Sequence, residues 1–271
     1  MKFPTTPMAA ALLALAACGA QAAHLQLVDA ATFGSSLTSV TAADGGQLGF
    51  SGPVDELSGL AEALAFGDGQ HTGSLAGSGL GFRSEWVRLA ALDASGATTR
   101  LQLSGSSAWH FDGTAELAEA LEQATVGLDA RLQVGSDGEA AGSAVRVRLQ
   151  LGAESLFSSS VAGAGDTPTF SLLVQDSGFN TLASYNGVAL NGRDTLDVAF
   201  DSAVGQTLTL SLVYANALGL GNASLTGVQR VESSALLDGT LSVSAVPEPQ
   251  SVALLLAGLG VVGTAARRRR A

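Results

Sequence analysis

Alternation of apolar and polar residues with a period of two is the feature that most restricts the fold of this chain. The clearest example is AVRVRLQLG, in which apolar residues alternate with arginines and a glutamine: Val145, Arg146, Val147, Arg148, Leu149, Gln150 and Leu151. The pattern recurs at 196–200, 207–214 and 241–243. Such alternation is typical of strands with one buried face and one face in water.

Turn dipeptides separate the alternating segments: Asp44-Gly45, Asp137-Gly138, Asn186-Gly187, Asn191-Gly192 and Asp238-Gly239. Asn-Gly and Asp-Gly accept positive φ angles and favour tight hairpins. Short strands joined by such turns predict an all-β fold, an antiparallel β-sandwich or jelly-roll-like domain.

Two segments interrupt the alternation and predict short helices packed on the sheet. Residues 55–66 place Leu57, Leu60, Ala61 and Leu64 on one helical face, and residues 114–125 do the same with Leu117 and Leu121, although a strand is also possible in the second. Residues 67–81 are rich in glycine, so we expect a surface loop there.

The amino terminus predicts an export signal. An apolar stretch runs from Met8 to Ala17, and Ala20 and Ala22 provide the small residues that a signal-peptide cleavage site needs. We therefore expect residues 1–22 to be a signal peptide cleaved after Ala22. Leu15 to Gly19 also resembles a lipobox around Cys18, in which case Cys18 would be acylated instead. Cys18 is the only cysteine, so residues 23–246 contain no disulfide.

The carboxyl end predicts a membrane anchor. Residues 251–266 carry no charge, and Arg267, Arg268, Arg269 and Arg270 follow at once. A helix of that length is ~24 Å long, and the arginines would snorkel to headgroups on the cytoplasmic side. Residues 23–246 would then face the periplasm. The Gly258-x-Gly260-x-x-Gly263 pattern lies inside this span and lacks the βαβ setting of a nucleotide site.

Pro247, Glu248 and Pro249, followed by this apolar span and arginine cluster, resemble the PEP-CTERM sorting signal of Gram-negative bacteria. The resemblance covers about 25 residues and none of residues 23–246. It implies that Pro247, Glu248 and Pro249 are recognised by exosortase, a membrane transpeptidase that removes the anchor and passes the protein outward. The prolines suit this role, since they keep the backbone extended. We therefore divide the chain into residues 1–22, an ectodomain at 23–246 and a sorting signal at 247–271.

The ectodomain is strongly acidic. It contains eight arginines, no lysine and 23 acidic residues, a net charge of −15. Such a surface repels nucleic acid and anionic lipid, and it suits a protein outside the cell.

Catalytic motifs are absent from the sequence. Of the three histidines, we expect His24 at a frayed terminus and His71 in a solvated loop. His110, near Asp112 and many serines, could be drawn into a Ser-His-Asp triad, but spacing alone does not supply the geometry. We expect no catalytic residues and no enzyme activity.

Binding signals are weak. Asp166, Asp176, Asp194, Asp197 and Asp201 leave a structural calcium ion possible, without a nameable ligand set. No other cofactor or metal is indicated. A glycan platform needs exposed rings, and we expect Trp86 and Trp109 in the core and Tyr185 to be the best candidate for an exposed ring.

These observations predict a non-enzymatic exported surface or matrix protein, sorted by exosortase and associated with exopolysaccharide or biofilm. It would be anchored in the inner membrane facing the periplasm before it reaches the surface or the medium. A glycan- or calcium-binding adhesin-like module is the alternative, and a secreted hydrolase is third.

Overall fold

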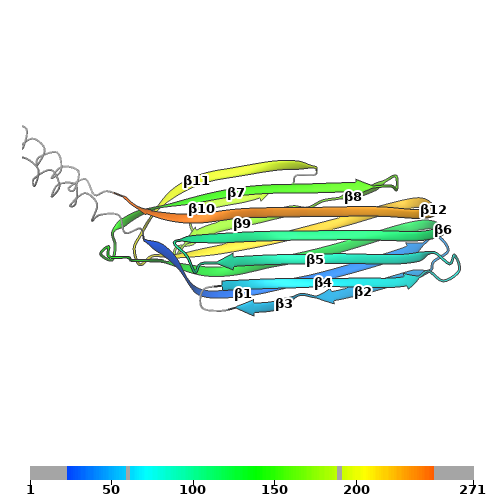
Figure 1. Ribbon diagram of the computed structural model, residues 1–271, viewed down its shortest axis with the longest axis horizontal. Helices are drawn as coiled ribbons and strands as arrows, with labels where there is room; N and C mark the ends of the chain where they lie inside the picture. Colours follow the sequence, from blue (N-terminus) through cyan, green and yellow to red (C-terminus); the bar gives the residue numbers. More distant parts are fainter. Residues whose placement is uncertain (1–22, 59–61, 188–190, 247–271) are drawn as a thin grey trace, which may run out of the picture.

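The computed structural model describes residues 23–58, 62–187 and 191–246, and these residues form twelve strands in one antiparallel sheet (Figure 1). The strands are β1 (His24–Ala42), β2 (Gln47–Pro53), β3 (Asp55–Ser58), β4 (Glu62–Ser74), β5 (Gly81–Asp93), β6 (Thr98–Gly135), β7 (Ala144–Ser159), β8 (Ala164–Asp166), β9 (Thr169–Asp176), β10 (Thr181–Gly187), β11 (Gly192–Ala203) and β12 (Thr207–Ala245). The expected all-β class is confirmed.

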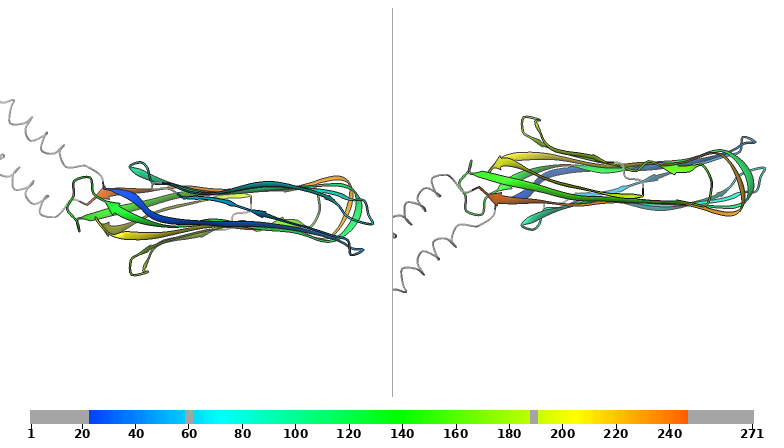
Figure 2. Two further views of the ribbon diagram at one scale, coloured as in Figure 1. Left: turned by 90° about the horizontal axis from the view of Figure 1, so that it is seen from below. Right: turned by 90° about the horizontal axis from the view of Figure 1, so that it is seen from above.

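Two very long strands organise the sheet. β6 has 38 residues and β12 has 39, and they pair antiparallel from Thr207 opposite Gln133 to Ser242 opposite Thr98. Their midpoints bend, so that the sheet folds over on itself (Figure 2). Gly113 and Gly227 face each other in the ladder at this bend, with φ angles of 127° and 69°. Side chains rarely tolerate such angles, which explains glycine at both positions.

The fold-over creates two layers. Layer 1 contains β3, β4, β5, the first half of β6, the second half of β12, β7 and β11. Layer 2 contains β2, β1, the second half of β6, the first half of β12, β9 and β10, with β8 at its margin. The layers of the expected sandwich are thus two halves of one continuous sheet.

Both ends of the described body lie at the end opposite the bend. His24 pairs with Gly135, and Ala245 pairs with Val145. The chain enters through β1 and leaves through β12 at this same end (Figure 1).

The core between the layers is divided in two. The larger apolar cluster includes Leu103, Val126 and Leu210, and the smaller one near the bend includes Trp109, Phe111 and Leu218. A belt of buried polar side chains lies between them: Ser84, Arg88, Ser107, Glu122, Asn216, Asp166 and Ser233. Hydrophobic burial drives the layers together. The buried polar side chains come from both layers, so their hydrogen bonds form only when the layers are aligned in one way.

The two predicted helices are wrong, since no helix occurs in the described residues. Residues 114–125 belong to β6. There the pairing with β1 slips by one residue between Thr41 and Ala42, leaving Ala118 as a bulge. Leu117 is buried and Leu121 faces outward, so the spacing of four that suggested a helix joins two opposite faces of the strand. In the first segment, 55–58 is strand β3 and 62–66 is part of β4, while 59–61 lies outside the described residues.

Of the other local predictions, some are confirmed and some are wrong. The strands predicted at 145–151, 196–200, 207–214 and 241–243 are confirmed. Residues 67–74 continue β4, so the expected loop shortens to 75–80. Asp238-Gly239 makes no turn, because it lies within β12. A Cβ on Gly239 would come within 2.3 Å of Leu151, the residue opposite it, so glycine serves packing here.

Candidate ligand-binding groove

A groove of about 880 Å³ crosses the outer face of layer 1, where β4, β5, β6, β12 and β7 lie side by side. Its floor consists of small side chains on the central strands β6 and β12, namely Ser106, Ala108 and Ser234. Longer side chains on β4, β5 and β7, together with Glu232 of β12, form the walls.

The register of the strands explains the hollow. Ala108 on β6 stands opposite Glu85 of β5 on one side and Glu232 of β12 on the other. Ser106 likewise stands between Val87 and Ser234. Short side chains in the middle of a sheet, flanked by long ones, leave a depression that runs across the strands.

Polar contacts hold the walls. Gln70 Nε2 donates a hydrogen bond to Glu85 Oε1 at 3.1 Å, and Arg83 forms an ion pair with the same carboxylate. On the opposite wall, Arg230 Nη2 lies 3.1 Å from Glu232 Oε1. These side chains are half-exposed, so the ion pairs add little stability. The contacts do orient the carboxylates of Glu85 and Glu232, whose other oxygen lone pairs remain available as acceptors.

Apolar side chains complete the lining beside these acceptors. Val87 and Leu156 are 41% and 66% exposed, whereas the Phe157 ring packs against the smaller apolar cluster of the core. The Phe157 backbone N–H donates to Asn191 Oδ1 at 2.6 Å, which fixes the end of the groove. The site therefore offers hydrogen-bonding groups and apolar contacts together, as small-molecule sites commonly do.

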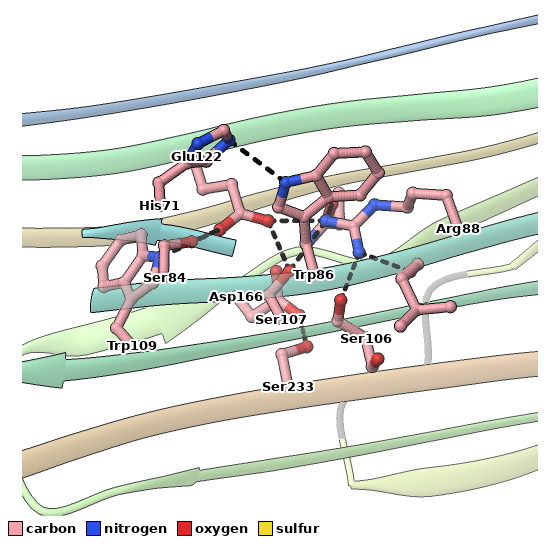
Figure 3. A network of polar contacts seen from close by, with 12 residues as sticks. His71, Ser84, Trp86, Arg88, Ser106, Ser107, Trp109, Glu122, Asp166 and Ser233 are labelled. Carbon is pink, nitrogen blue, oxygen red and sulfur yellow. Dashed lines mark hydrogen bonds and ion pairs between the residues drawn. The ribbon is translucent and has the colours of Figure 1, made fainter. Parts of the chain in front are cut away.

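The buried polar belt lies on the inner side of the strands whose outer side forms the floor, and Figure 3 shows its contacts. Arg88 Nη2 donates to Glu122 Oε1 at 2.6 Å and to Ser107 Oγ at 2.7 Å, and Trp109 Nε1 donates to Glu122 Oε2 at 2.9 Å. Arg88 and Glu122 are completely buried. Ser107 belongs to both the belt and the groove lining, so the belt supports the floor.

Asp166 extends the belt toward β12. Its Oδ2 accepts a hydrogen bond from Ser233 Oγ, and Ser233 also lines the groove. Burial raises the pKa of Asp166, while the hydrogen bonds from Ser233 and the Thr167 backbone partly lower it.

Sequence reasoning missed this belt, although part of the signal was present. Every second residue of β5 faces the core, and Arg88 falls in this series with Trp86, Ala90 and Leu92. A charged residue at a buried position indicates a buried partner of opposite charge. Glu122 could not be recognised in the same way, since the bulge at Ala118 changes which positions of β6 face inward.

His110 lies on the same outer face, one row from the carboxylates, between Arg83 of β5 and Arg230 of β12. Burial, and then the nearby charges of Arg230 and Arg83, lower its pKa, while Glu232 raises it. Within the part of the chain that the structure describes, no hydrogen bond joins His110 to a serine or a carboxylate. The geometry brings no Ser-His-Asp triad together there.

The other histidines are more ordered than predicted. His24 pairs with Gly135 inside β1, and its Nδ1 lies 3.0 Å from Asp137 Oδ1. His71 stacks on Phe50 with ring centroids 4.9 Å apart and shares a hydrogen bond of 3.3 Å with Trp86 Nε1. The expectations of a frayed terminus and a solvated loop were wrong, because both residues pair in strands.

The aromatic predictions were right for both tryptophans and wrong for Tyr185. Trp86 and Trp109 are 3% and 0% exposed. Tyr185 is only 9% exposed, and its hydroxyl donates to Asp194 Oδ2 at 3.1 Å, linking β10 to β11. Burial and this carboxylate raise the pKa of Tyr185 to about 12. No exposed tryptophan or tyrosine platform exists in the described residues.

The acidic residues considered for calcium do not gather. Asp197 and Asp201 of β11 form ion pairs with Arg148 and Arg146 of the neighbouring strand β7. Asp194 accepts a hydrogen bond from the Tyr185 hydroxyl. Asp176 caps its own turn through Asn180 and Gly178. Among the described residues, no cluster of three or more acidic, histidine or cysteine side chains could hold a metal ion.

Comparison with known families identifies a sorting motif at the carboxyl end. Residues 245–270 match the family model of the PEP-CTERM protein-sorting motif. The chain carries a PEP-CTERM sorting motif. The resemblance seen in Pro247, Glu248 and Pro249 is thereby confirmed. A PEP-CTERM motif implies an exported protein that exosortase sorts.

The PEP-CTERM match starts at Ala245, the last residue of β12. The backbone N–H of Val246 still donates to Ala144 O at 3.1 Å. The motif therefore follows the sheet without an intervening linker. Pro247, Glu248, Pro249, the span 251–266 and the arginine cluster lie outside the described residues, as do Ala20 and Ala22 of the expected signal peptide. Within the described ranges, no helix has the length and apolar character to cross a bilayer.

No curated protein matches the chain. Among solved structures, a CBM4 structure is 13% identical with a TM-score of 0.20, covering 57% of this chain and 88% of that one. The CBM22-1 xylan-binding domain of Paenibacillus barcinonensis Xyn10C is 12% identical with a TM-score of 0.19, covering 49% and 81%. An infectious bursal disease virus structure is 9% identical with a TM-score of 0.16, covering 86% and 82%. These TM-scores lie far below those of proteins that share a fold, so the similarities carry no functional weight.

Proposed function

We propose that residues 23–246 form the body of a non-enzymatic surface or extracellular-matrix protein, and that the groove on layer 1 binds exopolysaccharide. The observation that carries this proposal is a groove with a small-residue floor between polar walls, in a chain that ends in a PEP-CTERM motif.

Delivery would use both ends of the chain. Residues 1–22 would direct export and be cleaved after Ala22. Residues 251–266 and the arginines that follow would hold the protein in the inner membrane, with the sheet facing the periplasm. Exosortase would recognise Pro247, Glu248 and Pro249 and release the protein toward the surface or the medium.

The chemistry of the lining suits a sugar chain. Sugar hydroxyls can donate to Glu85 and Glu232 and can exchange hydrogen bonds with the Ser106 and Ser234 hydroxyls. The C–H faces of the sugars can pack on apolar side chains such as Leu156. Three carboxylates and one arginine line the groove (Asp68, Glu85, Glu232 and Arg83), which disfavours an anionic polymer. We therefore propose a neutral glycan.

Retention on a neutral exopolysaccharide from the producing bacterium, measured by affinity electrophoresis of the purified exported protein, tests this. Ala108→Trp should fill the groove and reduce retention at least tenfold. Gln102→Trp is the matched control, because Gln102 lies on the same strand and face but outside the groove. It should bind like the wild type.

Equal retention of the Ala108→Trp and wild-type proteins would remove the groove from the proposal. Shortening of the polysaccharide during incubation would contradict the non-enzymatic role. A requirement for added calcium, abolished by a chelator, would favour the calcium-dependent alternative.

A further inference from the structure

The outer face of layer 2 differs from the outer face of layer 1, because its middle carries no charge. On β6 the outward side chains between Glu119 and Asp129 are Leu121, Gln123 and Thr125, with Gly127 completing the series. β2 and β10 contain no charged residue, and on β9 the only one is Asp176, its last residue.

Layer 1 shows the opposite character. Its outer face carries ion pairs on β5, β7, β11 and β12, of which Arg148 with Asp197 and Arg230 with Glu232 are examples. In a body with a net charge of −15, an uncharged face is where a second copy can approach without bringing like charges together.

This uncharged face has a shallow hollow and a matching projection. The hollow, about 330 Å³, lies over Ala215 and Ala217 of β12, and Gln123 and Thr125 form its rim toward β6. The projection is Leu37 of β1, which is 51% exposed. Leu37 stands opposite Gln123, and Gln123 stands opposite Ala217, so the three lie in one row across the strands.

We propose that this face is a self-association surface, where two copies of the chain pack layer 2 against layer 2. A two-fold axis running along β6 would place β1 of one copy over β12 of the other. Leu37 of each copy would then enter the hollow over Ala215 and Ala217 of its partner. Gln123 would meet its own symmetry mate on the axis, as an isologous interface requires.

The size of the face is sufficient. About five strands spaced ~4.8 Å apart, over about nine residues each, cover on the order of 700 Å² per copy. Standard protein interfaces bury about 800 Å² per partner. Two sheets packed face to face lie ~10 Å apart, which small side chains such as Ala215, Ala217 and Thr125 permit.

The axis also agrees with the positions of the ends. An axis along the strands keeps Val246 of both copies at the same end, as joint attachment to one membrane requires. The groove lies on the outer face of layer 1, so pairing through layer 2 leaves it open in both copies. The inference does not depend on what the groove binds.

Light scattering after size-exclusion chromatography of the purified exported protein gives the first test. The wild type should have twice the mass of one chain. Leu37→Arg should give single chains, because it places a charge in the partner's hollow, and circular dichroism should show that it is folded. Gln102→Arg adds the same charge to the outer face of layer 1 and should remain a dimer.

Oxidative cross-linking on intact cells that produce the full chain gives the second test. Gln123→Cys should form a disulfide-linked dimer, because the axis brings the two copies of this position together. Ser106→Cys, in the groove, should form none above the wild-type background, which reports any contribution from Cys18. A monomeric wild type, or a Ser106→Cys variant that cross-links as efficiently as the Gln123→Cys variant, would overturn the proposal. If the wild type were monomeric and the Leu37→Arg substitution also abolished polysaccharide retention, a glycan and not a second copy would occupy this face.

Discussion

Trp109 and Glu122 lie thirteen positions apart on the same strand, yet the indole Nε1 of Trp109 donates a hydrogen bond to Glu122 Oε2 at 2.9 Å. They meet because β6 bends back at Gly113, which brings its two halves face to face. Arg88 of β5 joins the same carboxylate. This contact therefore reports directly on the alignment of the two layers.

Glu122→Gln should destabilise the protein by about 3–5 kcal/mol, because it leaves the Arg88 guanidinium charged and uncompensated in the core. Urea unfolding followed by tryptophan fluorescence measures the change. Adding Arg88→Met should restore much of the loss, since the double variant buries no charge. Asp29→Asn is the control, because it breaks an exposed pair with Arg131 and should change stability little. A single variant as stable as the wild type would contradict the role given to the belt.

Alanine at the bend should be costly for backbone reasons alone. Gly227→Ala should lose about 1 kcal/mol, since its φ of 69° is left-handed and no atom lies within 4 Å of the added Cβ. Gly113→Ala, at a φ of 127°, should lose about 1–3 kcal/mol. Gly152→Ala meets no atom and has no positive φ, so its midpoint of unfolding should not fall. Three equal midpoints would show that the bend does not depend on these angles.

The stability of the protein should decrease as the pH falls below 6.5, in part because of His110. The pKa of His110 in the folded protein lies below its ordinary value of 6.5, so the unfolded chain takes up a proton first. Stability is therefore lost between 6.5 and the lower folded pKa. Unfolding experiments across this window should show a smaller slope for His110→Gln than for the wild type. An NMR titration giving His110 a pKa above 6.5 would reverse the argument.

Processing at the PEP-CTERM motif should depend on its prolines. Replacing Pro247 and Pro249 with alanine should leave the full-length form in the membrane fraction, because the segment would no longer present an extended strand to exosortase. Immunoblots of membrane and medium fractions measure this. If the substituted protein were shortened and released normally, these residues would not be the recognised ones. The sheet itself should be unaffected, since both prolines follow β12.

The sequence predicted the strands well where alternation was regular, as in β7 and the start of β12. It failed where the register changes. The bulge at Ala118 shifts the buried positions of β6 from Leu117 to Ala120, so Leu117 and Leu121, whose spacing predicted a helix, lie on opposite faces of the strand. It also could not reveal that β6 and β12 are continuous, because a bent strand and two separate strands have the same local pattern.

The groove depends on the same long-range register. Ala108 forms part of a groove only because Glu85 and Glu232 lie on either side of it, and these residues are far from it in the sequence. Tyr185 illustrates the converse error. A ring next to an Asn-Gly pair was expected in water, but pairing with β9 turns it inward, where it contacts Asp194.

The course of β12 has a mechanical consequence. Its second half lies between β6 and β7, and it leads straight from the bend to the point where the PEP-CTERM motif begins. Tension applied at Val246 would act along this strand, at right angles to its hydrogen bonds. The bonds on both sides would then bear the load in shear, all at once, rather than opening one after another. Such a body would transmit a force applied at Val246 along β12 as far as the bend.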